Sequence, residues 1–77
     1  MKLKPYSHRQ VIKALTKLGF KVVRQRGSHI VLKGSYKEMK RTVVVPKHRE
    51  IAVGTLRSIL FQAGITVEEF ITLAEKS

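Results

Sequence analysis

Three short segments of alternating, β-branched sequence follow one another between residues 20 and 46, and they limit the fold more than any other feature. They read FKVVRQ, SHIVLKG and RTVVVP, and are separated by a break at Arg26-Gly27 and by a looser turn through SYKEMK. A parallel pairing needs a crossover of about a dozen residues or more, which neither connection provides. The sequence therefore predicts an antiparallel meander, which Pro46 closes because proline cannot donate to a strand ladder.

Helical patterns flank the meander on both sides. Ser7 and Gln10 have the spacing of a capping box, and the apolar residues that follow recur at helical spacing as far as Gly19. A second apolar stripe comes after the polar loop KHRE and comprises Leu56, Ile59, Leu60 and Ala63. Thr66 and Glu69 form another capping box, which predicts a short extra helix near the C-terminus. The predicted order is α-β-β-β-α with that additional helix, an α+β fold.

One face of the predicted sheet stays open, because two helices of this length can cover only one face of three strands. Side chains alternate between the faces along a strand, so Ile30 and Leu32 share one face. His29, Val31 and Lys33 share the other. The aliphatic pair belongs against the helices, and we therefore expect His29 to lie on the open face.

The length of 77 residues fits one domain, residues 1–77, and is too short for two. A domain this small buries only about 60% of the surface of its unfolded chain, so its core is expected to be thin. The chain contains no cysteine for a disulfide or a thiolate metal site. No apolar run approaches the ~18 residues of a spanning helix, and no apolar segment follows MKLKPYSHRQ. We expect a soluble, cytoplasmic protein that does not enter a membrane.

The charge is strongly positive and unevenly distributed. The chain has 16 lysines and arginines against 5 acids, a formal net charge of +11. Residues 1–49 hold 14 of the basic side chains and a single acid, Glu38, whereas residues 50–77 hold two basic and four acidic side chains. Such an excess repels itself unless a polyanion covers it, so a nucleic acid is the expected partner. The alternative is that surface lysine serves only solubility.

The residue types exclude several kinds of chemistry. Paired carboxylates cannot act in the basic half, where Glu38 is the only acid. His8, His29 and His48 are not at metal-ligand spacing and have no cysteine or aspartate to support them, so no metal site is predicted. Glycine-rich nucleotide-binding loops are absent, and no cofactor is expected.

His29 remains as the candidate for chemistry. RNA carries its own nucleophile, the 2′-hydroxyl, and needs a base, an acid and cations that stabilise the developing charge. Those cations would be Arg24, Arg26, Lys33 and Lys47. The alternative is that His29 is an ordinary exposed strand residue.

The neighbours of His29 have simpler roles. Gly27 supplies a positive φ in the first hairpin turn, or lets an RNA backbone come close. Ser28 is no partner for His29 in a nucleophile-base pair, because successive strand residues point to opposite faces, and it is counted with Gly27 among the RNA contacts. His48 is predicted to contact a phosphate, with a second acid/base role as the less favoured alternative, and Tyr36 to stack on a base.

Two stretches, VVRQRGSHIVLKG and VVVPKHREIAVGTLRSILFQAGI, resemble the HicA family of toxin messenger-RNA interferases from type II toxin-antitoxin modules. The resemblance extends over roughly residues 7 to 65, and its most specific parts are the Gly-Ser-His triplet, the Val-Pro-x-His loop and the GTLRSIL helix. It implies a fold like that of double-stranded-RNA-binding domains and metal-independent cleavage of messenger RNA. It also implies that His29 is the catalytic histidine and that a HicB-type antitoxin covers the basic sheet face.

Two other functions remain open from the residues alone. The first is a double-stranded-RNA-binding module without catalysis, although such domains place a lysine cluster at the start of the second helix, where this chain has Gly54-Thr55-Leu56-Arg57. The second is an interaction subunit whose basic surface meets an acidic protein. The last predicted helix lies beyond the resemblance, and it either completes the core or contacts a second copy or the antitoxin.

Overall fold

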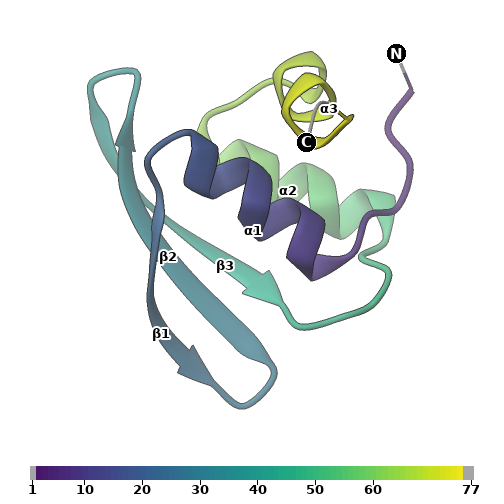
Figure 1. Cartoon of the computed structure of the whole chain (residues 1–77), viewed down its shortest axis with the longest axis horizontal. Coiled ribbons are helices and arrows are strands. Elements are labelled where there is room, and N and C mark those ends of the chain that lie inside the picture. The colour runs from purple at the N-terminus through teal and green to yellow at the C-terminus, as the bar shows by residue number, and fades with distance from the viewer. Residues whose placement is uncertain (1, 76–77) are drawn as a thin grey trace.

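The computed structural model describes residues 2–75 and has the predicted α-β-β-β-α order, followed by a further helix (Figure 1). The elements are α1 (His8–Lys17), β1 (Lys21–Arg26), β2 (His29–Tyr36), β3 (Met39–Pro46), α2 (Val53–Ala63) and α3 (Val67–Glu75). The strands form one antiparallel sheet in the order β1-β2-β3. The predicted α+β fold is therefore confirmed.

The predicted capping signals form as expected. The Ser7 hydroxyl accepts a hydrogen bond from the Gln10 N–H at 3.2 Å, while the Ser7 N–H donates to Gln10 Oε1 at 3.1 Å. The same reciprocal pair joins Thr66 and Glu69 at the start of α3. These side chains satisfy backbone N–H groups that have no partner inside the helix, which fixes where α1 and α3 begin.

The second hairpin turn differs from the prediction. The looser turn expected through residues 35–40 is wrong, because β2 and β3 stay paired as far as Tyr36 and Met39. Only Lys37 and Glu38 form the turn, with φ values of +53° and +65°. Two positive φ angles are typical of the tightest hairpin turns, which usually contain Gly or Asn. The sequence Lys-Glu carries no such signal.

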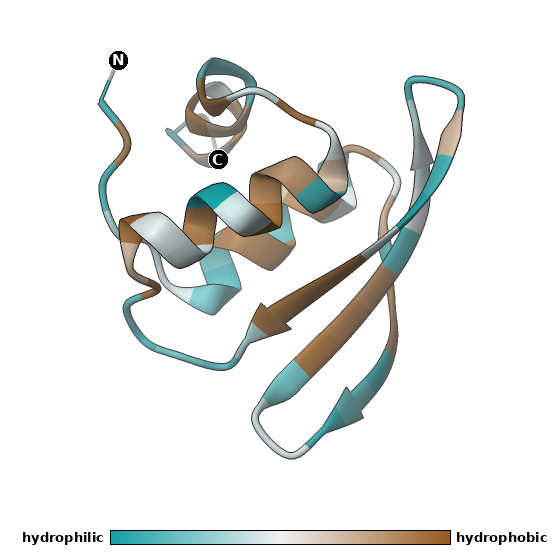
Figure 2. Cartoon of the chain, turned by 180° about the vertical axis from the view of Figure 1, so that it is seen from behind, coloured by the Kyte–Doolittle hydropathy of each residue, from teal (hydrophilic) through white to brown (hydrophobic). Residues whose placement is uncertain are grey.

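The core lies between one face of the sheet and the helices (Figure 1). Ile30 and Leu32 of β2 and Val43 and Val45 of β3 are buried on that face, as the alternation of β2 predicted. Figure 2 shows hydrophobic bands on β2 and β3, whereas the strand ends at the β1–β2 hairpin are hydrophilic and the turn between them is of intermediate hydropathy. No helix among residues 2–75 covers the opposite face of the sheet, which stays open as expected (Figure 1).

The segments that precede α1 and α2 lie side by side. Tyr6 and Ile51 form an isolated antiparallel bridge, in which the Ile51 N–H donates to the Tyr6 carbonyl at 2.7 Å. The N–H of His8 donates to the carbonyl of His48 at 3.0 Å. The start of α1 is thus fastened to the loop that leaves the sheet after β3.

Helix α3 packs on α1 and α2 and completes the core. Phe70 is fully buried, and its ring meets the Tyr6 ring edge to face, with the centroids 5.0 Å apart. The Tyr6 hydroxyl donates to Glu75 at 2.6 Å, and burial together with this contact raises the pKa of Tyr6 to about 12. Of the roles left open for the last helix, completion of the core is the one that the burial of Phe70 supports.

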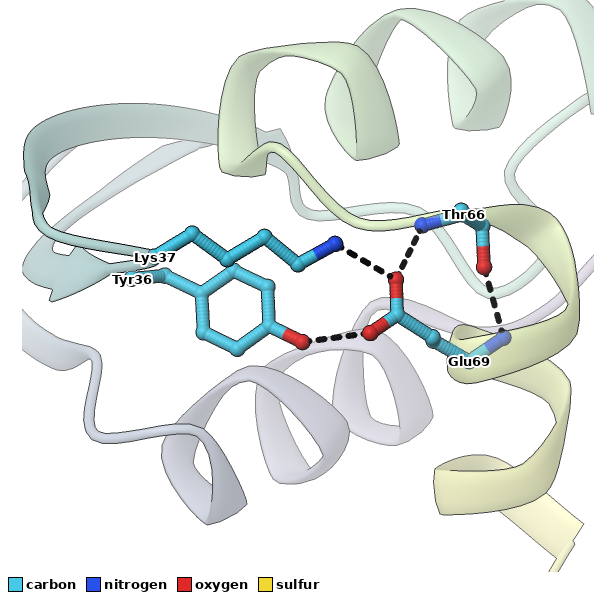
Figure 3. A network of polar contacts seen from close by, with 4 residues as sticks. All are labelled: Tyr36, Lys37, Thr66 and Glu69. Carbon is cyan, nitrogen blue, oxygen red and sulfur yellow. Dashed lines mark hydrogen bonds and ion pairs between the residues drawn. The ribbon is translucent and has the colours of Figure 1, made fainter.

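The first turn of α3 is joined to the β2–β3 turn by a polar network centred on Glu69 (Figure 3). The Tyr36 hydroxyl donates to Glu69 Oε2 at 2.5 Å, and Glu69 Oε1 accepts from the Thr66 N–H at 2.8 Å and the Lys37 ammonium at 3.3 Å. The Tyr36 hydrogen bond, followed by that from the Thr66 backbone, lowers the pKa of Glu69 to about 2. The carboxylate therefore stays ionised in the folded protein.

Candidate nucleic-acid interface

The register of the sheet arranges the side chains of the open face in rows that cross the strands. The first row comprises Arg26, His29 and Pro46, the second Arg24, Val31 and Val44, and the third Lys21, Lys33 and Thr42. Residues directly opposite one another in an antiparallel pair share a face. The open face is therefore the surface formed by these three rows and by the following pair, Ser35 and Lys40.

A β-bulge in β1 decides which of its side chains reach this surface. Val22 pairs with the buried Leu32, and simple alternation from Val22 would place Arg24 on the helical side. The register shifts between Val22 and Arg24, so Val23 is an extra residue and Arg24 pairs with Val31 instead. Bulges re-aim side chains in this way. The shift brings Arg24 and Arg26 to the same face as His29.

His29 begins β2 directly after the Gly27-Ser28 turn and is exposed. Gly27 has a φ of +57°, as predicted for this turn. Within residues 2–75, the His29 ring has no hydrogen-bond or ion-pair partner, so both of its nitrogens are available to a ligand. Its cross-strand neighbours are the guanidinium-bearing Arg26 and the rigid Pro46. The ring thus stands at the hairpin end of the open face, beside a cation.

The loop after β3 adds Lys47 to this end of the sheet. Its N–H donates to the Ser28 carbonyl at 2.6 Å, which extends the β2–β3 pairing by one step. Predicted residues Gly27, Ser28 and Lys47 therefore lie together at the turn that precedes His29. Lys47 is exposed.

His48 is fastened through its backbone to α1. Its carbonyl oxygen accepts the N–H of His8 and also lies 2.9 Å from His8 Nδ1. A carbonyl oxygen only accepts hydrogen bonds, so Nδ1 carries the proton in this contact. His8 received no role from the sequence, because its partner lies 40 residues away. The His48 side chain is exposed beside Lys47, and the loop that carries both is held from two sides.

Tyr36 does not belong to the open face. It pairs with Met39 on the helical side of the sheet, and its hydroxyl is committed to Glu69 (Figure 3). The expectation that Tyr36 stacks on a base is therefore wrong. Lys21 and Lys40, which the sequence did not single out, do lie on this surface. Alternation from Lys33 identifies them only once the register is known.

The charges of the open face have no counterions of their own. None of the residues in its rows is acidic. The two ion pairs found among residues 2–75 both use acids of α3, Lys4 with Glu75 at 3.6 Å and Lys37 with Glu69 at 3.3 Å. Between the cations, Val31 and the 38% exposed Val44 form an apolar centre. A surface with this composition fits a phosphate backbone together with bases or ribose.

Two further features of residues 2–75 concern metal binding and membrane insertion. Residues 2–75 contain no cluster of three or more His, Cys, Asp or Glu side chains able to hold a metal ion. None of the helices in this range has the length and apolarity needed to cross a bilayer.

Comparison with known proteins identifies one family. The model of the HicA toxin of bacterial toxin-antitoxin modules matches residues 8–65, more than half of the chain. A comparison with curated protein sequences finds no significant match. The matched region runs from the first residue of α1 to Ile65, directly after α2, and it includes every residue of the open face. Helix α3 lies outside it.

Proposed function

Because this chain belongs to the HicA family of toxins from bacterial toxin-antitoxin modules, we propose that it is an endoribonuclease that binds messenger RNA on the open face and cleaves it with His29. The observation that carries the proposal is the position of His29, which is exposed, without a partner in the described part of the chain, and next to Arg26 on a surface free of acids. A general acid-base group and cations for a phosphate are thereby available together.

The proposed cleavage reaction uses one histidine and no metal ion. Neutral His29 removes the proton of a ribose 2′-hydroxyl, whose oxygen attacks the adjacent phosphorus. The bond from phosphorus to the 5′-oxygen breaks, and the His29 imidazolium returns its proton to that oxygen. The products are a 2′,3′-cyclic phosphate and a 5′-hydroxyl end. Arg26, Arg24 and Lys47 stabilise the additional negative charge on the phosphoryl oxygens.

The remaining predicted residues bind and position the RNA. Gly27 and Ser28 form a small turn that leaves room for a backbone beside His29, and a Cβ atom added at Gly27 would meet nothing within 4 Å. Lys33 attracts phosphates farther along β2, and His48 contacts a phosphate from the loop beside Lys47. The protein acts in the cytoplasm, where messenger RNA is found.

The antitoxin of this module is proposed to be a HicB-type protein that covers the same surface. It needs an acidic surface to contact Arg24, Arg26, His29 and Lys33, since these side chains have no acidic neighbours in their rows. Mixing the protein with the product of the neighbouring gene is expected to abolish RNA cleavage. Undiminished cleavage in that mixture argues against this partner.

The deciding experiment compares wild-type protein with His29→Ala on end-labelled messenger RNA in EDTA. We expect cleavage by wild type only, with a loss of about 10²-fold or more in the variant, and RNA affinity within a few-fold. His48→Ala serves as the matched control, with weaker binding but a rate at saturating RNA within a few-fold of wild type. A rate retained in His29→Ala overturns the catalytic role of this residue.

The alternative function, a double-stranded-RNA-binding module without catalysis, is an outcome of the same experiment. The first turn of α2, which in such modules carries a lysine cluster, contains Gly54, Thr55 and Leu56, with the single cation Arg57 after them. Binding by both proteins without cleavage by either means that the chain is such a module or a toxin that has lost its activity.

A further inference from the structure

The open face is hollowed at the end of the sheet that lies away from His29. A cavity of about 430 Å³ is lined by the lysines and hydroxyl residues of three strands, Lys21, Lys33, Ser35, Lys40 and Thr42, together with Gly19, Gly34 and Arg41. Lys33 is four residues beyond His29 on β2, and successive strand residues rise by ~3.3 Å, so the two sites are about 13 Å apart. The hollow is therefore separate from the candidate catalytic site.

A close approach of two chain segments shapes this hollow. Gly34 lies on the helical side of β2, and a Cβ atom added to it would lie 2.9 Å from the Cα of Phe20. Only a glycine lets the chain that enters β1 come so near. That approach places Lys21, which follows Phe20, directly opposite Lys33. The close approach of the two backbones at Gly34 and Phe20 thus forms one wall of the hollow.

The lysines of the hollow are arranged unfavourably for the protein alone. Lys21 and Lys33 are a directly opposed pair of like charges, which destabilises an antiparallel ladder. Lys40 lies in the next row, opposite Ser35. None of these three lysines takes part in an ion pair in the described part of the chain. An anion in the hollow would remove the repulsion, and the hydroxyls of Ser35 and Thr42 would donate hydrogen bonds to it.

We propose that this hollow is a second binding site for an RNA phosphate, distant from the bond that is cut. The inference rests on the proposed function for the identity of the polymer. Successive phosphates of one strand are about 3.4 Å apart along a duplex axis and farther apart in an extended single strand, so a separation of about 13 Å places the bound phosphate a few nucleotides from the one at His29. The site gives affinity and a minimum length of substrate, and it contributes nothing to the chemical step.

The test measures RNA binding by the variant Lys21→Ala/Lys40→Ala. Both it and a control, Lys2→Ala/Lys13→Ala, are made in the His29→Ala background, so that no RNA is consumed. The control removes the same charge from exposed positions outside the open face. Binding of labelled oligouridylates of increasing length is followed by fluorescence anisotropy at several salt concentrations in EDTA, after circular dichroism has established that each protein is folded.

The parent protein is expected to gain affinity as the oligonucleotide becomes long enough to reach the hollow. The hollow variant loses that gain. For long oligonucleotides, the slope of log affinity against log salt concentration falls in magnitude by about 0.7 for each lysine removed. The control keeps the gain in affinity with length and the salt dependence of the parent protein. A hollow variant that behaves like the control overturns the proposal. An equal loss on the shortest and longest oligonucleotides also overturns it, because the lysines would then act through overall charge alone.

Failure of this site is distinguishable from failure of the proposed function. The binding measurement uses proteins without His29 and requires no cleavage. If wild type does not cut RNA but the hollow variant shows the predicted loss, the ribonuclease function is wrong and the phosphate site stands. If wild type cuts and the hollow variant binds every length like the control, the phosphate site is wrong and the ribonuclease function stands.

Discussion

The helical side and the open face of this domain use charge in opposite ways. On the helical side, Glu69 and Glu75 accept hydrogen bonds from the hydroxyls of Tyr36 and Tyr6, and these bonds are the main reason that the pKa values of both carboxyls are lowered. On the open face the cations have no acid in their rows. The acids of α3 bind tyrosine hydroxyls within the protein, and the cations of the sheet stay available to a polyanion.

The two sides also differ in what a substitution should change. The fully buried side chains lie between the helices and one face of the sheet, and the open face contributes only Val31 and Val44 as an apolar centre. In a domain with a thin core, stability depends on the first set. Substitutions on the helical side should therefore change the free energy of unfolding, and those on the open face should change RNA binding.

The largest expected effect tests the helical side. Phe70→Ala removes a fully buried ring that packs on Tyr6, and it should lower the free energy of unfolding by about 3–5 kcal/mol. Phe61→Ala is the matched control, because Phe61 on α2 is 85% exposed and should change stability by no more than about 0.5 kcal/mol. Urea unfolding followed by circular dichroism measures both. Similar losses in the two variants would contradict the assigned core.

The next largest effect is a loss of stability caused by a substitution beside the open face, at Gly27. It is an exception to the division between stability on the helical side and RNA binding on the open face. Gly27 has a φ of +57°, and a Cβ atom there would meet nothing, so the cost of Gly27→Ala is purely conformational, about 1–2 kcal/mol. Gly27→Asn should lose less stability, because Asn tolerates this conformation better. Urea unfolding measures the two losses, and an unchanged stability in Gly27→Ala would contradict the turn geometry.

The variant Gly27→Asn also separates the two roles considered for Gly27. If Gly27 serves only the turn, Gly27→Asn should cleave RNA at the wild-type rate. If cleavage falls in a Gly27→Asn protein that is fully folded, the RNA backbone comes close to this turn.

A smaller effect depends on pH and on the Glu69 network. The folded pKa of about 2 lies below the ordinary value of 4.5, so between these pH values the unfolded chain binds more protons. The stabilisation from Glu69 is complete above pH 4.5 and is lost as the pH falls towards 2. Because Glu69 is about one-third exposed, solvent screens its interactions. We therefore expect it to contribute only about 1 kcal/mol to the free energy of unfolding.

Glu69→Gln should remove part of this pH dependence. Stability measured by urea unfolding between pH 2 and 7 should fall less steeply in the variant than in wild type below pH 4.5. Glu75, whose pKa is also lowered through the Tyr6 hydroxyl, maintains the remaining slope. Glu68→Gln removes an exposed neighbouring carboxylate and is the control. Identical pH profiles in wild type and Glu69→Gln would disprove the stabilising role of the network.

Local signals predicted most of the fold. Both capping boxes, the order of the elements and the burial of Ile30 and Leu32 follow from spacings of two to four residues, which the backbone geometry of strands and helices enforces. The turn at Lys37 and Glu38 could not be predicted, because neither residue favours a positive φ by itself. There the pairing of the long strands imposes the conformation.

The candidate site was predictable only in part, because strand alternation reaches no farther than one uninterrupted strand. It placed His29 and Lys33 together on the open face. It could not place Arg24, since the bulge at Val23 changes the register through contacts with β2. The contact of His8 with the loop at His48 likewise joins residues 40 apart, and no short-range pattern encodes it. Catalysis by His29 was inferred from the family resemblance and not from any spacing.

The smallest expected effect on stability is the sharpest test of the open face. Arg24→Ala/Arg26→Ala removes two exposed guanidinium groups that have no ion-pair partner among residues 2–75, so unfolding should change by no more than about 0.5 kcal/mol. If the bulge directs both arginines to bound RNA, the slope of log affinity against log salt concentration should fall in magnitude by about 0.7 for each residue removed. The control Arg9→Ala/Arg57→Ala removes the same charge from α1 and α2 and should bind RNA with the wild-type salt dependence. An equal fall in both double variants, measured by filter binding, would mean that RNA responds to net charge, and the division between the two sides of the domain would then fail.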